Sequence, residues 1–252
     1  MTAERWWEGP LLGLDFETTG VDPLTAAPVS VAFGPVDVAG SFEPWVACLV
    51  DPGCEIPAEA TAVHRITTAM ARGGQPRRVV AAAIAERLSR NVATEHLPLV
   101  IYNAPFDWPI FVLEAQRAQV QLPAGQWIVD PLLLDRTLER YRRGSRKLAD
   151  VARRWGVELP ATQAHTAGAD VVAAVQTARA IARAWGPLPD ERSTASLRKT
   201  DLHFPGFQRR QGELYAAWRD DLNAYWRRIG AKEPDGSLRQ HVGEWPCGPL
   251  EP

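Results

Sequence analysis

The feature that most constrains the fold of this chain is the stretch Leu11–Gly20, which reads Leu-Leu-Gly-Leu-Asp-Phe-Glu-Thr-Thr-Gly. An apolar run of this length that ends in turn residues predicts a short buried strand. Side chains alternate between the two faces of a strand, so we expect Asp15 and Glu17 to point to the same side. Two carboxylates this close repel each other, and hard oxygen ligands suit Mg²⁺ or Mn²⁺. A solvated pair of acids at a strand end is the alternative interpretation at this point.

The composition is that of an ordinary globular protein. Hydrophobic residues make up 46% and charged residues 23% of the 252 residues, which suits one large domain or a domain with an appendage. Cys48, Cys54 and Cys247 have no metal-binding spacing, which predicts a reducing compartment without a disulfide framework. The first residues lack a long apolar segment, so we expect no signal peptide, no membrane span and a cytoplasmic location. The net charge of −2 neither requires nor excludes a nucleic-acid partner.

The order of the predicted elements indicates an α/β fold. Leu11–Phe16, Pro28–Val38 and Phe42–Val50 are predicted to form three antiparallel strands. Helices and short strands then alternate, which predicts a mixed sheet flanked by helices. The later strands are expected at Leu97–Tyr102 and Trp127–Val129, and the helices at Pro57–Val63, Pro76–Val92, Pro105–Val120, Leu132–Tyr141, Leu148–Trp155 and Gly168–Trp185.

The C-terminal part of the chain is predicted to be an extension. We expect one domain over residues 1–187 and, over residues 188–252, a polar linker, the amphipathic helix Phe207–Ile229 and a tail rich in proline and glycine. One helical stripe carries the apolar residues Leu214, Trp218, Leu222, Tyr225 and Ile229. Packing of this stripe onto the domain is the first expectation, and docking to a partner is the alternative.

Two further acids are placed so that they could join the first pair. Asp107 lies in the first turn of a helix that follows a core strand, and Asp170 lies early in the last helix of the domain. Each could merely complement a helix dipole. Three motifs nevertheless occur in order along the chain, namely Asp15-x-Glu17, Asn103-Ala-Pro-Phe-Asp107 and His165-x-x-x-x-Asp170.

With these motifs the chain resembles the histidine-bearing branch of the DEDD superfamily of 3′–5′ exonucleases. That DnaQ-like branch includes the proofreading subunit of bacterial DNA polymerase III, RNase T and oligoribonuclease. The resemblance spans residues 11–184 and implies an RNase H-like fold. Val63–Thr67 is also similar to the family's helix-capping segment, with Arg65 in place of the usual glycine, and Tyr102 stands where relatives often carry histidine.

The resemblance implies a metal-dependent exonuclease. Asp15, Glu17, Asp107 and Asp170 would hold two Mg²⁺ or Mn²⁺ ions, as the corresponding acids do in the family. Such a site stabilises both the attacking and the leaving oxygen of a phosphoryl displacement. His165 would be the general base, a role that the near-neutral pKa of histidine suits. Positions five apart on one helix point about 140° apart, so His165 must lie in the loop before the helix of Asp170.

Other residues near the motifs are candidates for substrate binding. Phe16 and Phe106 flank the acids and could stack on bases, with core packing as the alternative interpretation. His64 could pack against the terminal nucleotide, as the matching segment does in relatives, or be an ordinary surface histidine. The remaining candidates from the motifs are Thr18, Thr19 and Asn103.

A basic cluster follows the helix predicted at Leu132–Tyr141. Its members Arg142, Arg143 and Arg146 could bind phosphates or form a solvated helix end. Asp130, just before this helix, is expected to cap it rather than to bind a metal.

The expected function is hydrolysis of single-stranded DNA or RNA from its 3′ end to nucleoside 5′-monophosphates, with DNA favoured. Two alternatives are an inactive, polymerase-associated nucleic-acid-binding module and a metal-dependent phosphatase that acts on small phosphate esters. A DNA polymerase or a second copy of the chain is a further expected partner, through the helix Phe207–Ile229.

Overall fold

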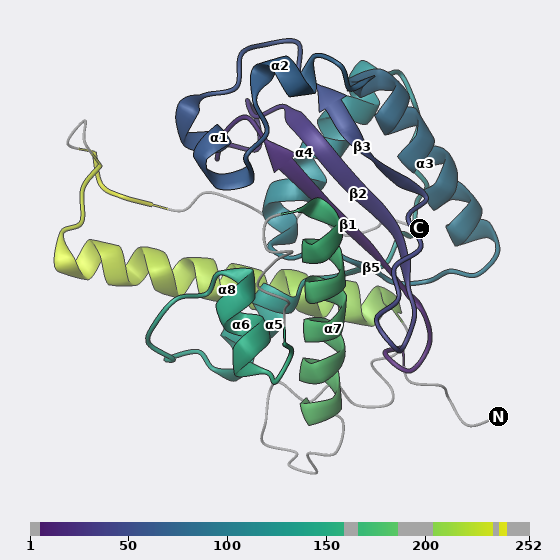
Figure 1. Ribbon diagram of the computed structural model, residues 1–252. Coiled ribbons are helices and arrows are strands. Elements are labelled where there is room, and N and C mark those ends of the chain that lie inside the picture. The colour runs from purple at the N-terminus through teal and green to yellow at the C-terminus, as the bar shows by residue number, and fades with distance from the viewer. Residues whose placement is uncertain (1–5, 159–165, 186–203, 234–236, 241–252) are drawn as a thin grey trace.

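The structure is a computed structural model that describes residues 6–158, 166–185, 204–233 and 237–240. A six-stranded sheet lies at its centre, with strands in the order β4-β3-β2-β1-β5-β6 (Figure 1). The strands are β1 (Leu11–Thr18), β2 (Pro28–Val36), β3 (Val46–Asp51), β4 (Gln75–Pro76), β5 (Leu99–Val100) and β6 (Ile128–Val129). β1, β2 and β3 pair antiparallel, whereas β1, β5 and β6 pair parallel. The predicted mixed α/β sheet is therefore confirmed.

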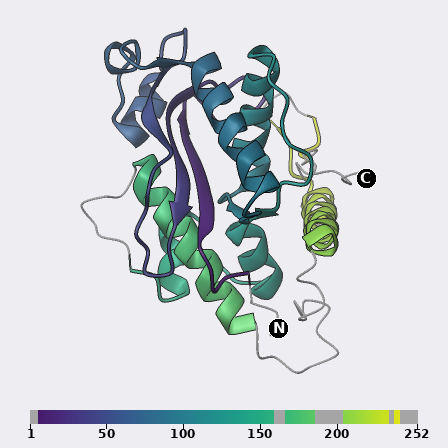
Figure 2. The same cartoon turned by 90° about the vertical axis from the view of Figure 1, so that its right-hand side faces the viewer.

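The helices lie on both faces of this sheet. They are α1 (Ala58–His64), α2 (Thr68–Ala71), α3 (Arg77–Ala93), α4 (Ala104–Arg117), α5 (Pro131–Leu138), α6 (Leu148–Arg154), α7 (Ala167–Trp185) and α8 (Phe204–Ile229). Figure 2 shows α7 on one face and α3 with α4 on the other. The cap predicted at Asp130 is confirmed, because its carboxylate accepts the N–H of Leu132 in the first turn of α5 at 2.9 Å.

Four of the strands are shorter than predicted, and two elements were not predicted. β2 ends at Val36 rather than Val38, and β6 begins at Ile128 rather than Trp127. β3 begins at Val46 rather than Phe42, because Pro44 has no N–H for a continuous ladder and Phe42 forms only an isolated bridge with Val36. β5 is limited to Leu99–Val100. The edge strand β4 and the single-turn helix α2 are too short to show a hydrophobic period in the sequence.

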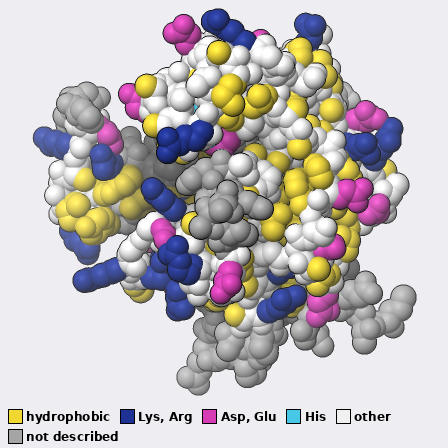
Figure 3. All heavy atoms as spheres, in the orientation of Figure 1, with side chains coloured by type: hydrophobic (Ala, Val, Ile, Leu, Met, Phe, Trp, Pro, Cys, Tyr) yellow, Lys and Arg dark blue, Asp and Glu magenta, His cyan; other side chains and the backbone are white. Residues whose placement is uncertain are grey.

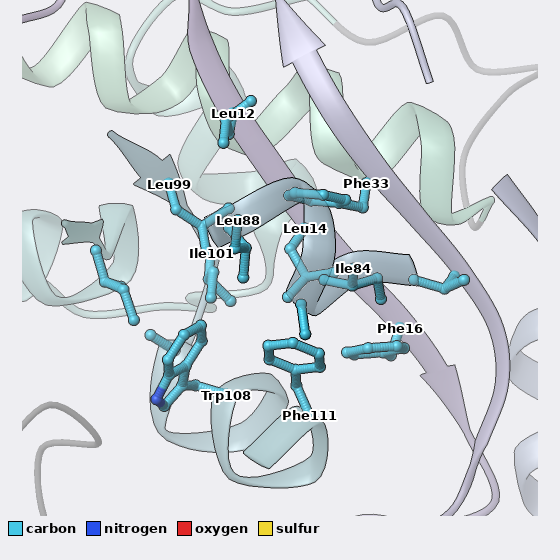
Figure 4. Close-up of a cluster of buried hydrophobic side chains, with 14 of the residues drawn as sticks. Leu12, Leu14, Phe16, Phe33, Ile84, Leu88, Leu99, Ile101, Trp108 and Phe111 are labelled. Carbon is cyan, nitrogen blue, oxygen red and sulfur yellow. The ribbon is translucent and has the colours of Figure 1, made fainter. Parts of the chain in front are cut away.

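Alternate residues of β1 belong to two separate cores. Leu12, Leu14 and Phe16 pack with residues of α3 and α4, as Figure 4 shows. Leu11 packs instead with residues of α7. Gly13 lies on this second face, where an added Cβ would come within 2.5 Å of a methyl carbon of Val171. The glycine therefore lets α7 approach β1 closely, on the face toward which Asp15 and Glu17 also point.

Helix α7 is tied to the rest of the sheet by Arg179, which is fully buried. Its guanidinium donates hydrogen bonds to the backbone carbonyls of Trp7, Gly9, Val36 and Asp37. These bonds satisfy a charge that would otherwise be costly to bury, and they fix the long axis of α7 against β1 and β2.

Helix α8 packs onto the domain by its N-terminal half, beside α5. Gln211 is fully buried, and its side-chain amide donates to the carbonyl of Ile128 at 2.6 Å and accepts the N–H of Asp130 at 3.0 Å. Tyr215 is also buried, and Leu214 and Trp218 pack against the same core. The expected packing is confirmed for this half. In the other half Tyr225 and Ile229 are exposed.

The boundary predicted after residue 187 and most of the predicted linker lie outside the described residues. Of the predicted tail, Lys232 and Leu238 form an isolated bridge. No helix in the described ranges combines the length and the hydropathy that crossing a bilayer requires.

Candidate active site

Three carboxylates meet where the carboxyl end of β1 lies beside the start of α7. Asp15 and Glu17 come from β1 and Asp170 comes from the first turn of α7. One oxygen from each can be chosen so that all three lie within 4.8 Å of one another. The predicted convergence of these three acids, far apart in sequence, is thus present in the structure.

The fourth predicted acid, Asp107, lies on the other side of β1. It belongs to the first turn of α4, is 4% exposed, and accepts the backbone N–H of Phe16 at 3.1 Å. It is not part of the three-acid group, but its charge acts on Asp15. The structure therefore places Asp107 next to the group, with one of its oxygens engaged by the strand.

The pKa values show the cost of gathering these acids. Burial, together with the charges of Asp107, Asp170 and Glu17, raises the pKa of Asp15 well above its usual range. Burial and the charge of Asp170 raise the pKa of Glu17 to about 7. Burial raises the pKa of Asp107 to about 8, although the Phe16 N–H opposes this shift. A cation between the acids would favour their charged forms, and carboxylate oxygens are what Mg²⁺ and Mn²⁺ prefer, so the residues present fit such ions.

Asp130 supports the turn that leads to Asp107, a role that the sequence did not predict. Its carboxylate accepts the N–H of Asn103 at 2.9 Å and that of Ala104 at 3.1 Å, besides the N–H of Leu132. Asn103 adopts the left-handed conformation, with φ of 62°, which is uncommon outside glycine and tolerated best by asparagine and aspartate. Burial raises the pKa of Asp130 to about 6, against the effect of these N–H groups. Asp130 thus positions the start of α4.

The predicted general base, His165, lies outside the described residues. The described chain resumes at Thr166, whose carbonyl accepts the N–H of Asp170 at 3.0 Å, and α7 begins at Ala167. The position predicted for His165 before this helix stays a prediction.

Comparison with known proteins identifies the family. Residues 12–178 match the family model RNase_T, described as exonuclease. The chain belongs to this exonuclease family. The matched residues include the acids of all three motifs, so the resemblance inferred from those motifs is confirmed.

Relatives of this exonuclease-family chain include much longer proteins. A DNA polymerase III subunit epsilon-like protein of Rhodobacter capsulatus is 34% identical over 172 residues, which are 64% of this chain and 22% of that protein. Exonuclease I of E. coli, solved with a dA16 oligonucleotide, has a TM-score of 0.56 at 21% identity, over 69% of this chain and 41% of its own. Exonuclease I of Methylocaldum szegediense has a TM-score of 0.54 at 23% identity, over 69% and 40%. The structural likeness confirms the RNase H-like fold.

The family's capping segment lies at the end of α1. His64 is 6% exposed, and its Nδ1 accepts the N–H of Ile66 at 3.0 Å. Burial lowers the pKa of His64, and the backbone of Thr18 opposes this shift, which places the imidazole near the end of β1. Arg65, at the glycine position of the family, has a left-handed φ of 65°. His64 is therefore no ordinary surface histidine, and its contact with a nucleotide stays a prediction.

The other candidate substrate-binding residues differ in burial and in the hydrogen bonds of their side chains. Phe16 is buried in the core with Phe111 and Trp108 (Figure 4), which favours the core-packing interpretation, whereas Phe106 is partly exposed. The hydroxyl of Thr18 donates to the carbonyl of Gly20 at 2.8 Å, and that of Thr19 accepts the N–H of Ala27 at 3.0 Å. Both hydroxyls thus hold the turn after β1.

The basic cluster contains a buried acid that the sequence did not single out. Asp135, on α5, is fully buried and forms ion pairs with Arg142, at 2.9 Å, and with Arg146. Its other oxygen accepts the indole N–H of Trp155 at 2.9 Å. Arg143 is exposed instead. Two of the three arginines predicted to bind phosphates are therefore engaged within the protein.

Proposed function

We propose that this chain is a metal-dependent 3′–5′ exonuclease that hydrolyses single-stranded nucleic acid, with DNA favoured, to nucleoside 5′-monophosphates. The observation that carries the proposal is the group of Asp15, Glu17 and Asp170 at the end of β1, with Asp107 beside it. The family match supports exonuclease chemistry, and the oligonucleotides dA16 and dT13 bound to exonuclease I of E. coli favour a DNA strand.

The four acids are proposed to hold two Mg²⁺ or Mn²⁺ ions. When bound, such ions stabilise the charge that develops on the attacking and leaving oxygens of an in-line phosphoryl displacement. The protein contributes by holding the carboxylates in place before the ions and the substrate bind. Asp15 and Glu17 are fixed by the sheet, Asp170 by the packing of α7 on Gly13, and Asp107 by the N–H of Phe16. This preorganisation means that no carboxylate has to be moved during the reaction.

His165 is proposed to take a proton from the attacking water. A neutral imidazole is required for this, so the rate should rise with pH through the pKa of the histidine and then level off. General-base catalysis is worth about 10²–10⁴-fold, which is the loss expected for His165→Ala in single-turnover rates at saturating Mg²⁺. A variant within a few-fold of the parent, with the same pH profile, would remove His165 from the mechanism.

The direct test of the function uses single-stranded DNA and RNA labelled at the 5′ end, incubated with Mg²⁺, Mn²⁺ or EDTA and resolved on a gel. We expect a ladder of labelled products that shortens progressively from the 3′ end, no reaction in EDTA, and faster loss of DNA than of RNA. A strand with a blocked 3′ end is the matched control and should stay intact. Early release of labelled mononucleotide would contradict the direction, and absence of hydrolysis with every metal would contradict the activity.

Association with a DNA polymerase is a further part of the proposal. It is supported by the relative named as DNA polymerase III subunit epsilon-like, of which this chain covers only 22%. Co-sedimentation of the purified chain with a replicative polymerase from the same organism would test it, and separate sedimentation of the two proteins at micromolar concentration would contradict it.

A further inference from the structure

A groove lies between the C-terminal half of α8 and the residues that follow α5. It has a volume of about 620 Å³, and its lining includes Arg140, Tyr141, Trp218, Tyr225 and Arg228. We call it the α8 groove. None of the four proposed metal-binding acids lines it, and α8 lies beyond the residues that match the exonuclease family. The groove is therefore a feature that the proposed active site does not explain.

The two tyrosines of the α8 groove are exposed to solvent. Tyr141 is 86% exposed and Tyr225 is 47% exposed. The packing of α8 onto the domain uses Gln211 and Tyr215, which precede this part of the helix, and Trp218, which also lines the groove. Figure 3 shows hydrophobic side chains bordered by lysine and arginine on the part of the molecule that projects to the left, where Figure 1 places the end of α8.

Each tyrosine is accompanied by an arginine. The guanidinium carbon of Arg140 lies 5.6 Å from the ring centroid of Tyr141, and that of Arg228 lies 5.5 Å from the ring centroid of Tyr225. Trp218, also in the lining, has the guanidinium carbon of Arg136 4.0 Å from its ring centroid. The acid in the lining, Asp221, forms an ion pair with Arg140. The lining therefore carries an excess of positive charge next to exposed rings.

We propose that the α8 groove binds single-stranded nucleic acid, with bases stacked on Tyr141 and Tyr225 and phosphates beside Arg140 and Arg228. Base stacking on aromatic side chains accepts any sequence, and arginines beside the rings provide the positive charge that follows a phosphate backbone. An apolar peptide would gain from the rings, but it would leave Arg228 without an anionic partner in the groove, since Asp221 is already paired with Arg140. The charge of the groove thus selects a strand over an apolar partner.

Binding at the α8 groove is tested apart from hydrolysis. Fluorescence anisotropy of a labelled 20-nucleotide poly(dT) strand, titrated with the full chain in EDTA, measures affinity without cleavage. We expect the double variant Tyr141→Ala/Tyr225→Ala to bind about tenfold or more weakly, because one stacked base contributes about that factor. Tyr141→Phe/Tyr225→Phe keeps both rings and should bind within about twofold of the parent. Thermal melting of each variant checks that α8 stays packed.

A charge-matched pair of variants gives an independent test. Arg228 and Arg90 each lie in the last turn of a helix, α8 and α3, and both are exposed. Arg228→Ala should weaken strand binding and lower the dependence of affinity on salt, whereas Arg90→Ala should change neither. These measurements need no hydrolysis, so they test strand binding at the α8 groove even if the proposed exonuclease activity is absent.

Two results would overturn the proposal. One is parental affinity of a folded Tyr141→Ala/Tyr225→Ala variant together with parental affinity of Arg228→Ala. The other is analytical ultracentrifugation that shows the parent as a dimer and the double tyrosine variant as a monomer, with strand affinity unchanged. That second result would make the α8 groove a contact between two copies of the chain.

Discussion

Two groups of acids in this molecule differ in what neutralises them. Asp135, on α5, is fully buried, yet two arginines and an indole N–H surround its oxygens. At the end of β1, Asp15 and Glu17 lie beside Asp170, and neither of these two strand acids forms an ion pair with a lysine or arginine in the part of the chain that the structure describes. The charge of Asp135 is balanced within the protein, whereas the proposed function assigns cations from solution to the acids at the end of β1.

This difference separates a structural acid from a functional one. A buried charge is tolerated when the protein supplies its partners, and removal of one partner is then strongly destabilising. Acids that raise one another's pKa work against folding unless a ligand restores the balance. Such a group of acids destabilises the fold. A cluster of carboxylates with strongly shifted pKa values therefore indicates a functional site.

The largest effect is expected on activity when an acid of the three-carboxylate group is neutralised. Asp15→Asn and Glu17→Gln keep side-chain shape but remove a metal ligand charge, so hydrolysis should fall by about 10³-fold or more, since the ions supply several kcal/mol. Single-turnover cleavage of a labelled strand measures the loss. Glu86→Gln, on the exposed face of α3, is the matched control and should keep parental activity. A folded Asp15→Asn protein with parental rates would refute the metal-site proposal.

The opposite pattern is expected at Asp135. Asp135→Asn leaves Arg142 and Arg146 without their buried carboxylate, and loss of one partner of a buried pair costs about 3–5 kcal/mol. The free energy of unfolding, from urea denaturation monitored by circular dichroism, should fall by an amount at or below this range because both arginines are partly exposed. Asp15→Asn, measured in EDTA, should not destabilise the protein. Equal destabilisation by the two substitutions would erase the distinction between the two groups of acids.

The sequence was sufficient to predict the sheet and the acidic group because both depend on local patterns. The period-two alternation of β1 places Asp15 and Glu17 on one face, and the three motifs place the other acids at helix starts. The prediction was weaker where a residue acts across the fold. Asp130 was expected only to cap α5, yet it also holds the N–H groups of Asn103 and Ala104, 27 and 26 residues away. Nothing in the local sequence indicates that the ends of β5 and β6 lie side by side.

The arginine cluster illustrates the same limit. Arg142 and Arg146 were predicted to contact phosphates because a nucleic-acid substrate was expected, with a solvated helix end as the alternative. Their partner Asp135 lies next to Arg136 and Thr137 in α5, and this local sequence gave no sign that its carboxylate is buried beneath the cluster. Spacings of 7 and 11 residues correspond to no helical or strand contact, so only the turn between α5 and α6 brings these charges together.

A smaller effect is expected on stability as a function of pH in the absence of metal. The folded-state pKa values of Glu17, about 7, and Asp107, about 8, are raised above those of the unfolded chain. Between pH of about 4 and about 8 the folded state therefore binds more protons, so stability is highest at low pH and falls as pH rises through this window. In EDTA the melting temperature should be lower at pH 8 than at pH 5.5.

Two controls connect this pH dependence to the acidic group. If Mg²⁺ binds the ionised carboxylates of the folded state, as proposed, it should raise the melting temperature at pH 8 more than at pH 5.5. In EDTA, Asp107→Asn should reduce the decrease of melting temperature between pH 5.5 and pH 8. Asp135→Asn should lower the melting temperature at every pH and leave that decrease unchanged. A melting temperature in EDTA that rises steadily from pH 5.5 to pH 8 would contradict the assignment.

The smallest effect is expected for the arginines of the cluster, where the contrast predicts that only the exposed member contacts phosphate. Arg143→Ala should reduce the slope of log affinity against log salt for a single strand by about 0.7, the value for one phosphate contact, and leave stability unchanged. Arg142→Ala should leave that slope unchanged but lower the free energy of unfolding by about 1–3 kcal/mol, because Asp135 then loses a charged hydrogen-bond donor. Anisotropy titrations at several salt concentrations and urea denaturation measure the two quantities on the same proteins. If Arg142→Ala changed the salt slope but not the stability, the ion pair between Arg142 and Asp135 would have to open when a strand binds. The arginine cluster would then be part of the functional site rather than a structural feature around Asp135.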